Sequence, residues 1–288
     1  MKKKIIALIL AALAVVMCFS FAACKNDNAS DGNAADADKE TTVADNAASD
    51  LAYIKEKGKL VIGYTEIPLL NYNDENGNFV GFETDFAKAV CAELGVEAEF
   101  QLISWAAKET ELASKNIDCI WNGMTITPER AEAMSISTPY MANKQVLIVK
   151  AEDADKYLKA EDMDGVAVVA EQGSAGEEVI TAEDFFAKAN FTAVSYQTDA
   201  LREVKAGTAD ACVIDYIAAK GAIGEGTDYE DLVIVDAVSF ADEEYGIAFR
   251  KGSDVTAEVN AIITKLVENG KLAEIGEEYK IAEQIIAK

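Results

Sequence analysis

The hydrophobic and polar positions from residue 59 onward alternate between two periods. Short apolar runs rich in branched residues predict strands, and stretches with apolar residues at every third or fourth position predict helices. Expected strands are residues 59–64, 98–103 and 118–121, and expected helices are residues 84–94, 108–114 and a helix beginning at Pro128. Strands that alternate with helices along the chain are typical of parallel sheets.

A second series with the same alternation begins at residue 165. Its expected elements are strands 165–170, 191–196 and 210–214, with helices 176–187 and 198–206 between them. Residues 111–120 and 203–212 share one order of residue types: an acid, an apolar residue, a small spacer, an aspartate and a buried strand. The doubling predicts an α/β protein with two lobes, each a mainly parallel sheet flanked by helices.

Two β-rich runs stand apart from these series. Residues 143–149 have no helix after them, and residues 244–249 occupy the corresponding place after the second series. We interpret them as two crossovers, which assigns residues 51–142 and 243–288 to the first lobe and residues 143–242 to the second. A discontinuous lobe joined to its neighbour by two strands has a natural hinge.

The first 23 residues have the order of a secretory signal peptide. Lysines at positions 2 to 4 precede an apolar stretch from Ile5 to Phe21, and small residues then lead directly to Cys24. This order resembles the bacterial lipoprotein signal, which implies that Cys24 carries the lipid, such as palmitate, and becomes the mature N-terminus. The alternative is an uncleaved transmembrane anchor, because the apolar stretch approaches spanning length.

The segment after Cys24 is predicted to be a tether. From Lys25 to about Asp50 the chain consists mostly of Ala, Asn, Asp, Ser and Thr, which cannot bury enough apolar area to fold. We therefore expect residues 24–50 to be the lipidated cysteine and a flexible linker. The folded part is then exported and held on the outer face of the bacterial cell membrane, or on the periplasmic side in a cell with two membranes.

Composition excludes several classes of function. The 288 residues include 51 acidic and 26 basic side chains, with a formal net charge of -25, so no basic excess is present for nucleic acid. Histidine is absent, which removes Ser-His-Asp and Cys-His catalysis and His-containing zinc sites. We expect no cofactor, no metal and no catalytic residue. Outside the signal segment, Cys91, Cys119 and Cys212 lie in apolar runs and are expected to be buried free thiols.

Five motifs in the expected folded part occur in a characteristic order. They are the segments 77–85, 117–130, 171–174, 207–215 and 244–252. Together they resemble the polar amino-acid-binding proteins of ABC importers, the bacterial solute-binding protein family 3, over about residues 51–285. The resemblance implies a two-lobe periplasmic-binding-protein-like fold of type II, a free amino acid as ligand, and an importer permease and ATPase as partners.

A receptor for a free amino acid needs a fixed cation and a fixed anion. Arg130 is the candidate cation, since a positive charge in the first turn opposes the helix dipole unless another partner justifies it. A bidentate contact to the ligand's carboxylate is one such partner, and a surface pair with Glu129 or Glu132 is the alternative. The resemblance makes Thr125 and the backbone at Gly123 further partners of the ligand.

The second lobe supplies the opposite wall. Gly173 and Ser174 follow a predicted strand and open a helix, so their backbone N–H groups can meet an anion. Ser174 with Glu177 also fits a capping box, and both roles can hold at once. Asp215 ends a buried strand, and the resemblance assigns it to the ligand's ammonium group, with a helix N-cap as the alternative.

One expected feature of the family is missing. Family members commonly have aromatic residues in the loop after the first strand, and Ile67 and Leu70 occupy those positions in this chain. Trp105 is left as the candidate aromatic wall, with a place in the core as the alternative. The ligand's side chain therefore stays open, with a slight preference for cystine over glutamine, histidine or glutamate.

The combined interpretation is a monomeric, lipid-anchored protein that captures a free polar amino acid by hinge closure and is not an enzyme. One alternative is a cyclohexadienyl or arogenate dehydratase on the same fold, which needs only a carboxyl general acid such as Glu66 or Glu109. The other is a ligand-sensing subunit of a receptor.

Overall fold

The structure, a computed structural model, describes residues 49–240 and 242–288. The expected signal peptide, the lipid on Cys24 and nearly all of the expected tether lie outside these residues. Within them, no helix is both long enough and apolar enough to cross a membrane.

The first of two larger sheets has five strands. Their order is β4 (Glu97–Leu102), β1 (Lys59–Tyr64), β5 (Cys119–Ile120), β13 (Ala248–Phe249) and β6 (Ser135–Ile136). A small hairpin of β2 (Tyr72–Asn73) and β3 (Phe79–Val80) lies in the same part of the chain. Strand β1 pairs in parallel with β4 and β5, whereas β13 pairs antiparallel with β5 and β6.

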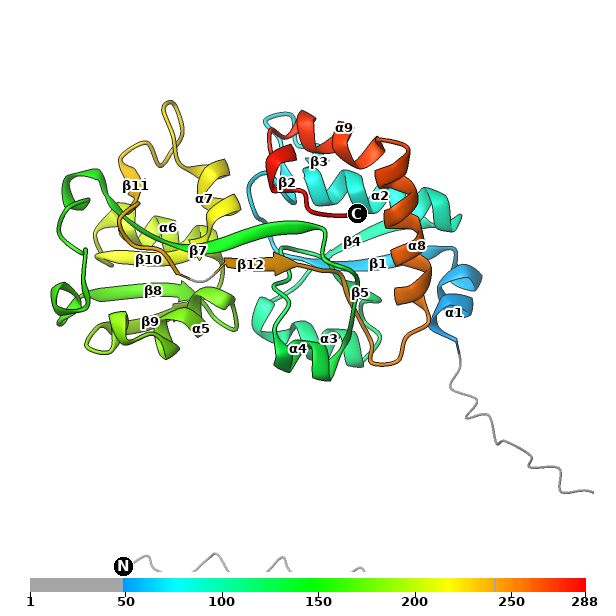
Figure 1. Ribbon diagram of the computed structural model, residues 1–288, viewed down its shortest axis with the longest axis horizontal. Helices are drawn as coiled ribbons and strands as arrows, with labels where there is room; N and C mark the ends of the chain where they lie inside the picture. Colours follow the sequence, from blue (N-terminus) through cyan, green and yellow to red (C-terminus); the bar gives the residue numbers. More distant parts are fainter. Residues whose placement is uncertain (1–48, 241) are drawn as a thin grey trace, which may run out of the picture. The chain divides into compact units, whose positions relative to one another are not determined.

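Helices from both ends of the chain belong with this first sheet. They are α1 (Asp50–Lys57), α2 (Phe82–Leu94), α3 (Lys108–Ala113), α4 (Pro128–Ala133), α8 (Val255–Glu268) and α9 (Lys271–Glu278), with short 3-10 turns η1 (Trp105–Ala107) and η5 (Ala282–Gln284). Helix α2 contacts both α8 and α9 (Figure 1). It ends at Gly95, whose left-handed φ of 74° closes the last turn.

The second large sheet has strands in the order β11 (Leu232–Ile234), β7 (Met141–Lys150), β10 (Ala211–Asp215), β8 (Ala167–Glu171) and β9 (Asn190–Val194). Its helices are α5 (Ala175–Ala182), α6 (Gln197–Ala206) and α7 (Tyr216–Ala222), with 3-10 turns η2 (Ala151–Asp153), η3 (Ala160–Met163) and η4 (Asp184–Phe186). The α/β class and the two-lobe arrangement predicted from the doubled pattern are confirmed.

Both sheets are mixed, where the sequence predicted mainly parallel ones. Each contains two parallel and two antiparallel pairings along its path. The antiparallel pairings involve β7 in the second sheet and β13 in the first, which are strands of the crossover segments. A parallel neighbour requires a long return connection, usually a helix, and a crossover that arrives without one can enter antiparallel.

Two strands connect the lobes. Strand β12 (Asp242–Tyr245) pairs antiparallel with the first four residues of β7, and the remainder of β7 pairs with β10 and β11 (Figure 1). One strand therefore takes part in both the connection and the second sheet, and a change in the angle between the lobes must be absorbed along β7 and β12.

The cores are built from the apolar faces that the pattern indicated. Phe86, Val90 and Leu94 of α2 are buried together with Trp121, and the Phe86 and Trp121 rings meet edge to face at 5.0 Å. Cys91, Cys119 and Cys212 are buried free thiols, which confirms their expected state.

Candidate ligand-binding site

A cavity with about 240 Å³ of empty space lies beyond the carboxyl ends of strands from both sheets. It is lined by Ile67, Trp105, Asn122, Gly123, Thr125, Arg130, Glu171, Ser174, Ala175, Gln197 and Asp215. The first six follow β1, β4 and β5, and the last five end or follow β8, β9 and β10. Ligands bind at this end of open α/β sheets.

Seven of the nine residues singled out in the sequence line this cavity, and Leu70 and Gly173 do not. Leu70 is fully buried, and its Cδ1 lies 3.4 Å from where a Cβ on Gly123 would be. The tight turn from Ile67 directs it there, since Leu70 N donates to Ile67 O at 3.1 Å. Leu70 therefore supports the Gly123 loop from behind and forms no ligand wall.

Arg130 is the guanidinium of the cavity and is only 5% exposed. Thr127 caps α4 by accepting from the Arg130 backbone N at 3.2 Å, with Pro128 in the first turn. In the side chain, Nη1 donates to Thr125 O at 3.0 Å. Nη2 donates to Glu178 Oε1 at 2.6 Å, so the partner of Arg130 is an acid of the second lobe.

The alternative of a surface pair between Arg130 and Glu129 or Glu132 is wrong. Both glutamates are exposed, and neither forms an ion pair with Arg130 in the described residues. The reason is the direction of the guanidinium, which points away from its own helix toward the second lobe. A carboxylate that enters the cavity competes there with the half-exposed Glu178.

Gly123 and Thr125 follow β5 in a loop that is held by contacts with Tyr245 and Glu83. Gly123 has a φ of +56°, which favours glycine, and a Cβ there would meet the Tyr245 ring at 3.3 Å. Its N–H donates to Glu83 Oε1 at 2.9 Å. Thr125 forms an antiparallel bridge with Tyr245, the last residue of the hinge strand β12. The loop therefore has one conformation available beside Arg130.

Glu83 holds this loop from inside the core. It is 1% exposed and also accepts from Asn71 Nδ2 at 2.7 Å and from the Tyr140 hydroxyl. Burial raises its pKa to about 7 in spite of these three donors. An acid in the first turn of α2 is favourable for the helix dipole, so Glu83 serves both the helix and the Gly123 loop.

Asp215 is the carboxylate of the opposite wall and is 5% exposed. It accepts from three side-chain amides: Asn143 Nδ2 at 2.8 Å, Gln145 Nε2 at 2.7 Å and Gln197 Nε2. It occupies the N-cap position of α7 but makes no side-chain capping bond; Asn143 Oδ1 accepts from Ile217 N instead. The amides leave Asp215 as a hydrogen-bonded acceptor facing the cavity.

The hinge strands share this amide cluster. Glu243 of β12 accepts from Gln145 Nε2 at 2.9 Å and from Asn143 Nδ2. Burial and the neighbouring charge of Asp215 raise the pKa of Glu243 to about 8. The ammonium-binding candidate is therefore connected directly to the hinge.

Ser174 takes the capping role that was its alternative. Its hydroxyl accepts from Glu177 N at 3.2 Å, and the Glu177 carboxylate accepts from Gly173 N. The Gly173 N–H is thus occupied by an acid of its own chain. The Gly173 carbonyl faces the first lobe and accepts from Lys108 Nζ at 3.0 Å and Arg130 Nη2 at 3.4 Å.

Trp105 lies both at the cavity and in the core. It lines the cavity, and it packs in a core cluster with Leu112 and Met124 while 4% exposed. Lys108 Nζ lies 4.9 Å from the centre of its ring. Burial and the nearby Arg130 lower the pKa of this lysine to about 8.

Four lining residues were not predicted: Asn122, Glu171, Ala175 and Gln197. Asn122 links the loops after β5 and β1, since its Oδ1 accepts from Thr65 N at 2.9 Å and its Nδ2 donates to Thr65 O at 2.7 Å. Glu171 opens the motif 171–174, and its position at the end of β8 was the available signal. Gln197 carried no signal, because it looked like any polar residue at a helix start.

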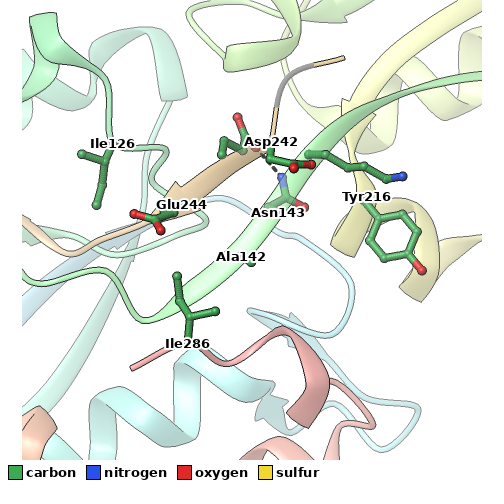
Figure 2. A pocket seen from close by; sticks show the side chains of 9 residues that line it. Ile126, Ala142, Asn143, Tyr216, Asp242, Glu244 and Ile286 are labelled. Atoms are coloured by element: carbon green, nitrogen blue, oxygen red, sulfur yellow. Dashed lines mark hydrogen bonds between the residues drawn. The ribbon is translucent and has the colours of Figure 1, made fainter. Parts of the chain in front are cut away.

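A second, wider hollow lies over the hinge and is open to solvent. Figure 2 shows Ala142 and Asn143 of β7 together with Asp242 and Glu244 of β12, with Tyr216 of α7 and Ile286 of the C-terminal segment at its edges. Its lining includes Lys144 together with Asp242, Glu243 and Glu244, but it is open to solvent, and the enclosed cavity is the better candidate site. In residues 49–240 and 242–288 no cluster of three or more His, Cys, Asp or Glu is placed to hold a metal.

Comparison with known proteins identifies the family of this chain. Residues 60–282 match the family described as bacterial extracellular solute-binding proteins, family 3. The arginine-binding extracellular protein ArtP of Bacillus subtilis is 31% identical over 234 residues, which cover 79% of this chain and 88% of ArtP. The L-cystine-binding protein TcyJ of Escherichia coli K12 is 28% identical over 233 residues, 78% of this chain and 84% of TcyJ.

Solved structures share the same fold. The crystal structure of the ancestral amino acid-binding protein AncCDT-1, a precursor of cyclohexadienyl dehydratase, has a TM-score of 0.72 and 33% identity, with 80% of this chain and 99% of that chain covered. The type II periplasmic-binding-protein fold implied by the resemblance is thereby confirmed. With its family match over most of the described residues, this chain belongs to the bacterial extracellular solute-binding proteins of family 3.

Proposed function

We propose that this protein captures one free α-amino acid between its lobes and delivers it to an ABC importer. The observation that carries the proposal is the pairing of a guanidinium and a carboxylate across one enclosed cavity. Arg130 comes from the first lobe and Asp215 from the second. A free amino acid presents a carboxylate and an ammonium at a fixed separation, and only the closed arrangement brings both partners to it.

Binding then drives closure. The ligand docks on the first lobe through Arg130 and the Gly123–Thr125 loop, and the second lobe adds Asp215 and Ser174. A ligand shifts the equilibrium toward the closed form only through contacts that the open form lacks. Asp215, which three amide donors hold in place, supplies such a contact to the ligand's ammonium group. The permease and ATPase of the importer would recognise the closed form.

The relatives support the class of ligand. ArtP is named for arginine and TcyJ for cystine. Cystine stays our slight preference from the sequence alone, and the charge of the cavity gives a separate indication of the ligand, which is developed below. Ile67 in place of an aromatic residue leaves Trp105 as the aromatic side of the cavity.

Thermal unfolding in the presence of each free amino acid and of cystine tests the proposal. A single ligand, or one chemical group of ligands, should raise the unfolding temperature. The variant Arg130→Ala should lose this rise while it keeps the fold, since removing one partner of a buried charged contact costs about 2–5 kcal/mol of binding free energy. Arg202→Ala, at an exposed arginine of α6, is the matched control. An unchanged rise in Arg130→Ala would remove Arg130 from the site.

We also propose that the protein acts as a monomer anchored outside the cytoplasm by a lipid on Cys24. The signal-like order of residues 1–24 supports this placement. Labelling of cells with a fatty acid should mark the wild-type protein and not Cys24→Ala, which should appear unlabelled in the soluble exported fraction. Equal labelling of the two proteins would contradict the assignment.

We propose further that the protein is not an enzyme. The carboxyl acids first considered for the dehydratase alternative, Glu66 and Glu109, are both exposed and absent from the cavity lining, and the carboxyl groups that do line it are Glu171 and Asp215. The likeness to a dehydratase precursor makes the comparison worth an assay. Incubation with prephenate or arogenate should give no rise in the ultraviolet absorbance of an aromatic product, and a rise would reverse this conclusion.

A further inference from the structure

The cavity contains a buried carboxyl group that the grip on an α-amino acid does not use. Glu171 is the last residue of β8, lines the cavity and is 1% exposed. Its Oε1 atom has no hydrogen-bond partner among the described residues. Asp215, the other carboxyl of the lining, has three amide donors. A buried charged group without a partner is costly, so a group inside the cavity is expected to complete Glu171.

The cations nearest to Glu171 are engaged elsewhere. Lys108 on α3 attracts it through space but donates to the backbone carbonyls of Gly173 and Trp105. Arg130 on α4 donates to Thr125 O and Glu178. Neither forms an ion pair with Glu171 in the part of the chain that the structure describes.

The remaining charges that Glu171 faces are negative. Asp215 at the end of β10 lies in the same cavity, and the charge of Asp199 on α6 also raises the pKa of Glu171. Once a ligand's carboxylate meets Arg130 and its α-ammonium meets Asp215, one negative group is left over. One more positive charge on the ligand would therefore neutralise the remaining negative group of the cavity.

We infer that Glu171 is the counter-charge for a cationic side chain, so that this cavity selects amino acids with a second positive group, such as arginine or lysine. The inference rests on the proposed function, because it assumes that Arg130 and Asp215 hold the α-carboxylate and α-ammonium. In this inference Glu171 determines which amino acid binds, whereas Arg130 and Asp215 bind the α-carboxylate and α-ammonium that every amino acid has.

Binding of a cationic side chain is also expected to change the protonation of Glu171. Burial and the charge of Asp215 raise the pKa of Glu171 well above its usual range, which favours the protonated carboxyl in the absence of ligand. A guanidinium or ammonium placed beside it favours the ionised form. The proton passes to the buffer, the ligand keeps its charge, and binding of a cationic amino acid releases up to one proton.

The test compares arginine with citrulline, which has nearly the same shape but a neutral urea group. Isothermal titration of the wild-type protein should show arginine binding at least about 30-fold more tightly, the lower end expected for a buried charge pair. Glu171→Gln should reduce this ratio to a few-fold, chiefly by weakening arginine. Glu183→Gln, which removes an exposed acid of the same lobe, should keep the wild-type ratio.

Titration in two buffers with different ionisation enthalpies measures the proton directly. Arginine should release a proton from the wild type and citrulline should not, and this comparison holds even if Glu171→Gln does not fold. Equal affinity for arginine and citrulline, or a preference for cystine or glutamine over arginine and lysine, would overturn the inference while the proposed function stands. Absence of binding by every amino acid would overturn both.

Discussion

Gly221 offers a direct test of lobe closure, because it is a helical glycine of the second lobe that faces the first. A Cβ added to it would lie 2.7 Å from Leu69 Cγ, 2.8 Å from Pro68 Cβ and 3.0 Å from the Pro68 carbonyl carbon. The last of these is backbone and cannot rotate away. The variant Gly221→Ala therefore obstructs the closed arrangement and leaves the interior of each lobe untouched.

The expected effect has opposite signs on stability and on binding. Alanine favours a helix over glycine by about 0.5–1 kcal/mol, so the ligand-free protein should unfold at the same or a higher temperature. Overpacking costs typically about 1–3 kcal/mol, and here it falls on the closed form alone. Because 1.4 kcal/mol corresponds to a tenfold change, the ligand should bind about 5- to 150-fold more weakly.

Isothermal titration and thermal unfolding of the ligand-free protein measure the two effects. Gly176→Ala is the contrasting variant, since its Cβ would lie 2.7 Å from Val213 O within the second lobe and should lower ligand-free stability. Ligand affinity of Gly221→Ala within twofold of the wild type would refute the reasoning. It would mean that the lobes do not come together at Pro68 when the ligand binds.

Two further predictions concern the buried groups. Burial raises the pKa of Glu83 from an ordinary 4.5 to about 7, so the folded state holds this proton more tightly and the stability it gives is lost as pH rises from about 4.5 to 7. This difference in pKa corresponds to about 3 kcal/mol of unfolding free energy. Urea unfolding at about pH 5 and pH 8 should show a smaller fall in the free energy of unfolding for Glu83→Gln than for the wild type. Equal falls in the two proteins would contradict this prediction. Cys91, Cys119 and Cys212 are buried, and burial raises the pKa of all three thiols, that of Cys91 to about 12. Iodoacetamide should label none of the three in the folded protein and all of them in urea, and rapid labelling of the native protein would show that they open to solvent.

The periodicity of the sequence was sufficient for the elements and the two lobes, because each depends on local patterns. The strand predicted at 59–64 is β1, and the helix predicted at 198–206 differs from α6 by one residue at its start. Helix α1 was missed because its charged residues continue the polar character of the segment before it. The mixed pairing of the sheets could not be read from the pattern, since the direction in which a crossover strand enters is a property of the whole topology.

The residues of the candidate site also include some that the sequence indicated and others that it could not indicate. Arg130 and Asp215 stand at ends of predicted elements, where a charge without a local reason is visible in the sequence. Glu178 as the partner of Arg130 was not foreseeable, because the pair exists only when the two lobes are together. Glu83 was overlooked because the expected helix began at Thr84, one residue too late to show an acid turned toward the Gly123 loop.

Strand β7 changes partners within its length. Residues Met141 to Lys144 pair with β12, and Gln145 to Val149 pair with β10. The two ladders share no rung, so the strand can bend between Lys144 and Gln145 without breaking either set of hydrogen bonds. The side chains on both sides of that joint, Asn143 and Gln145, donate to Asp215. A rotation of the lobes therefore alters the support of Asp215, the proposed ammonium site, so the hinge would take part in ligand recognition as well as in the movement of the lobes.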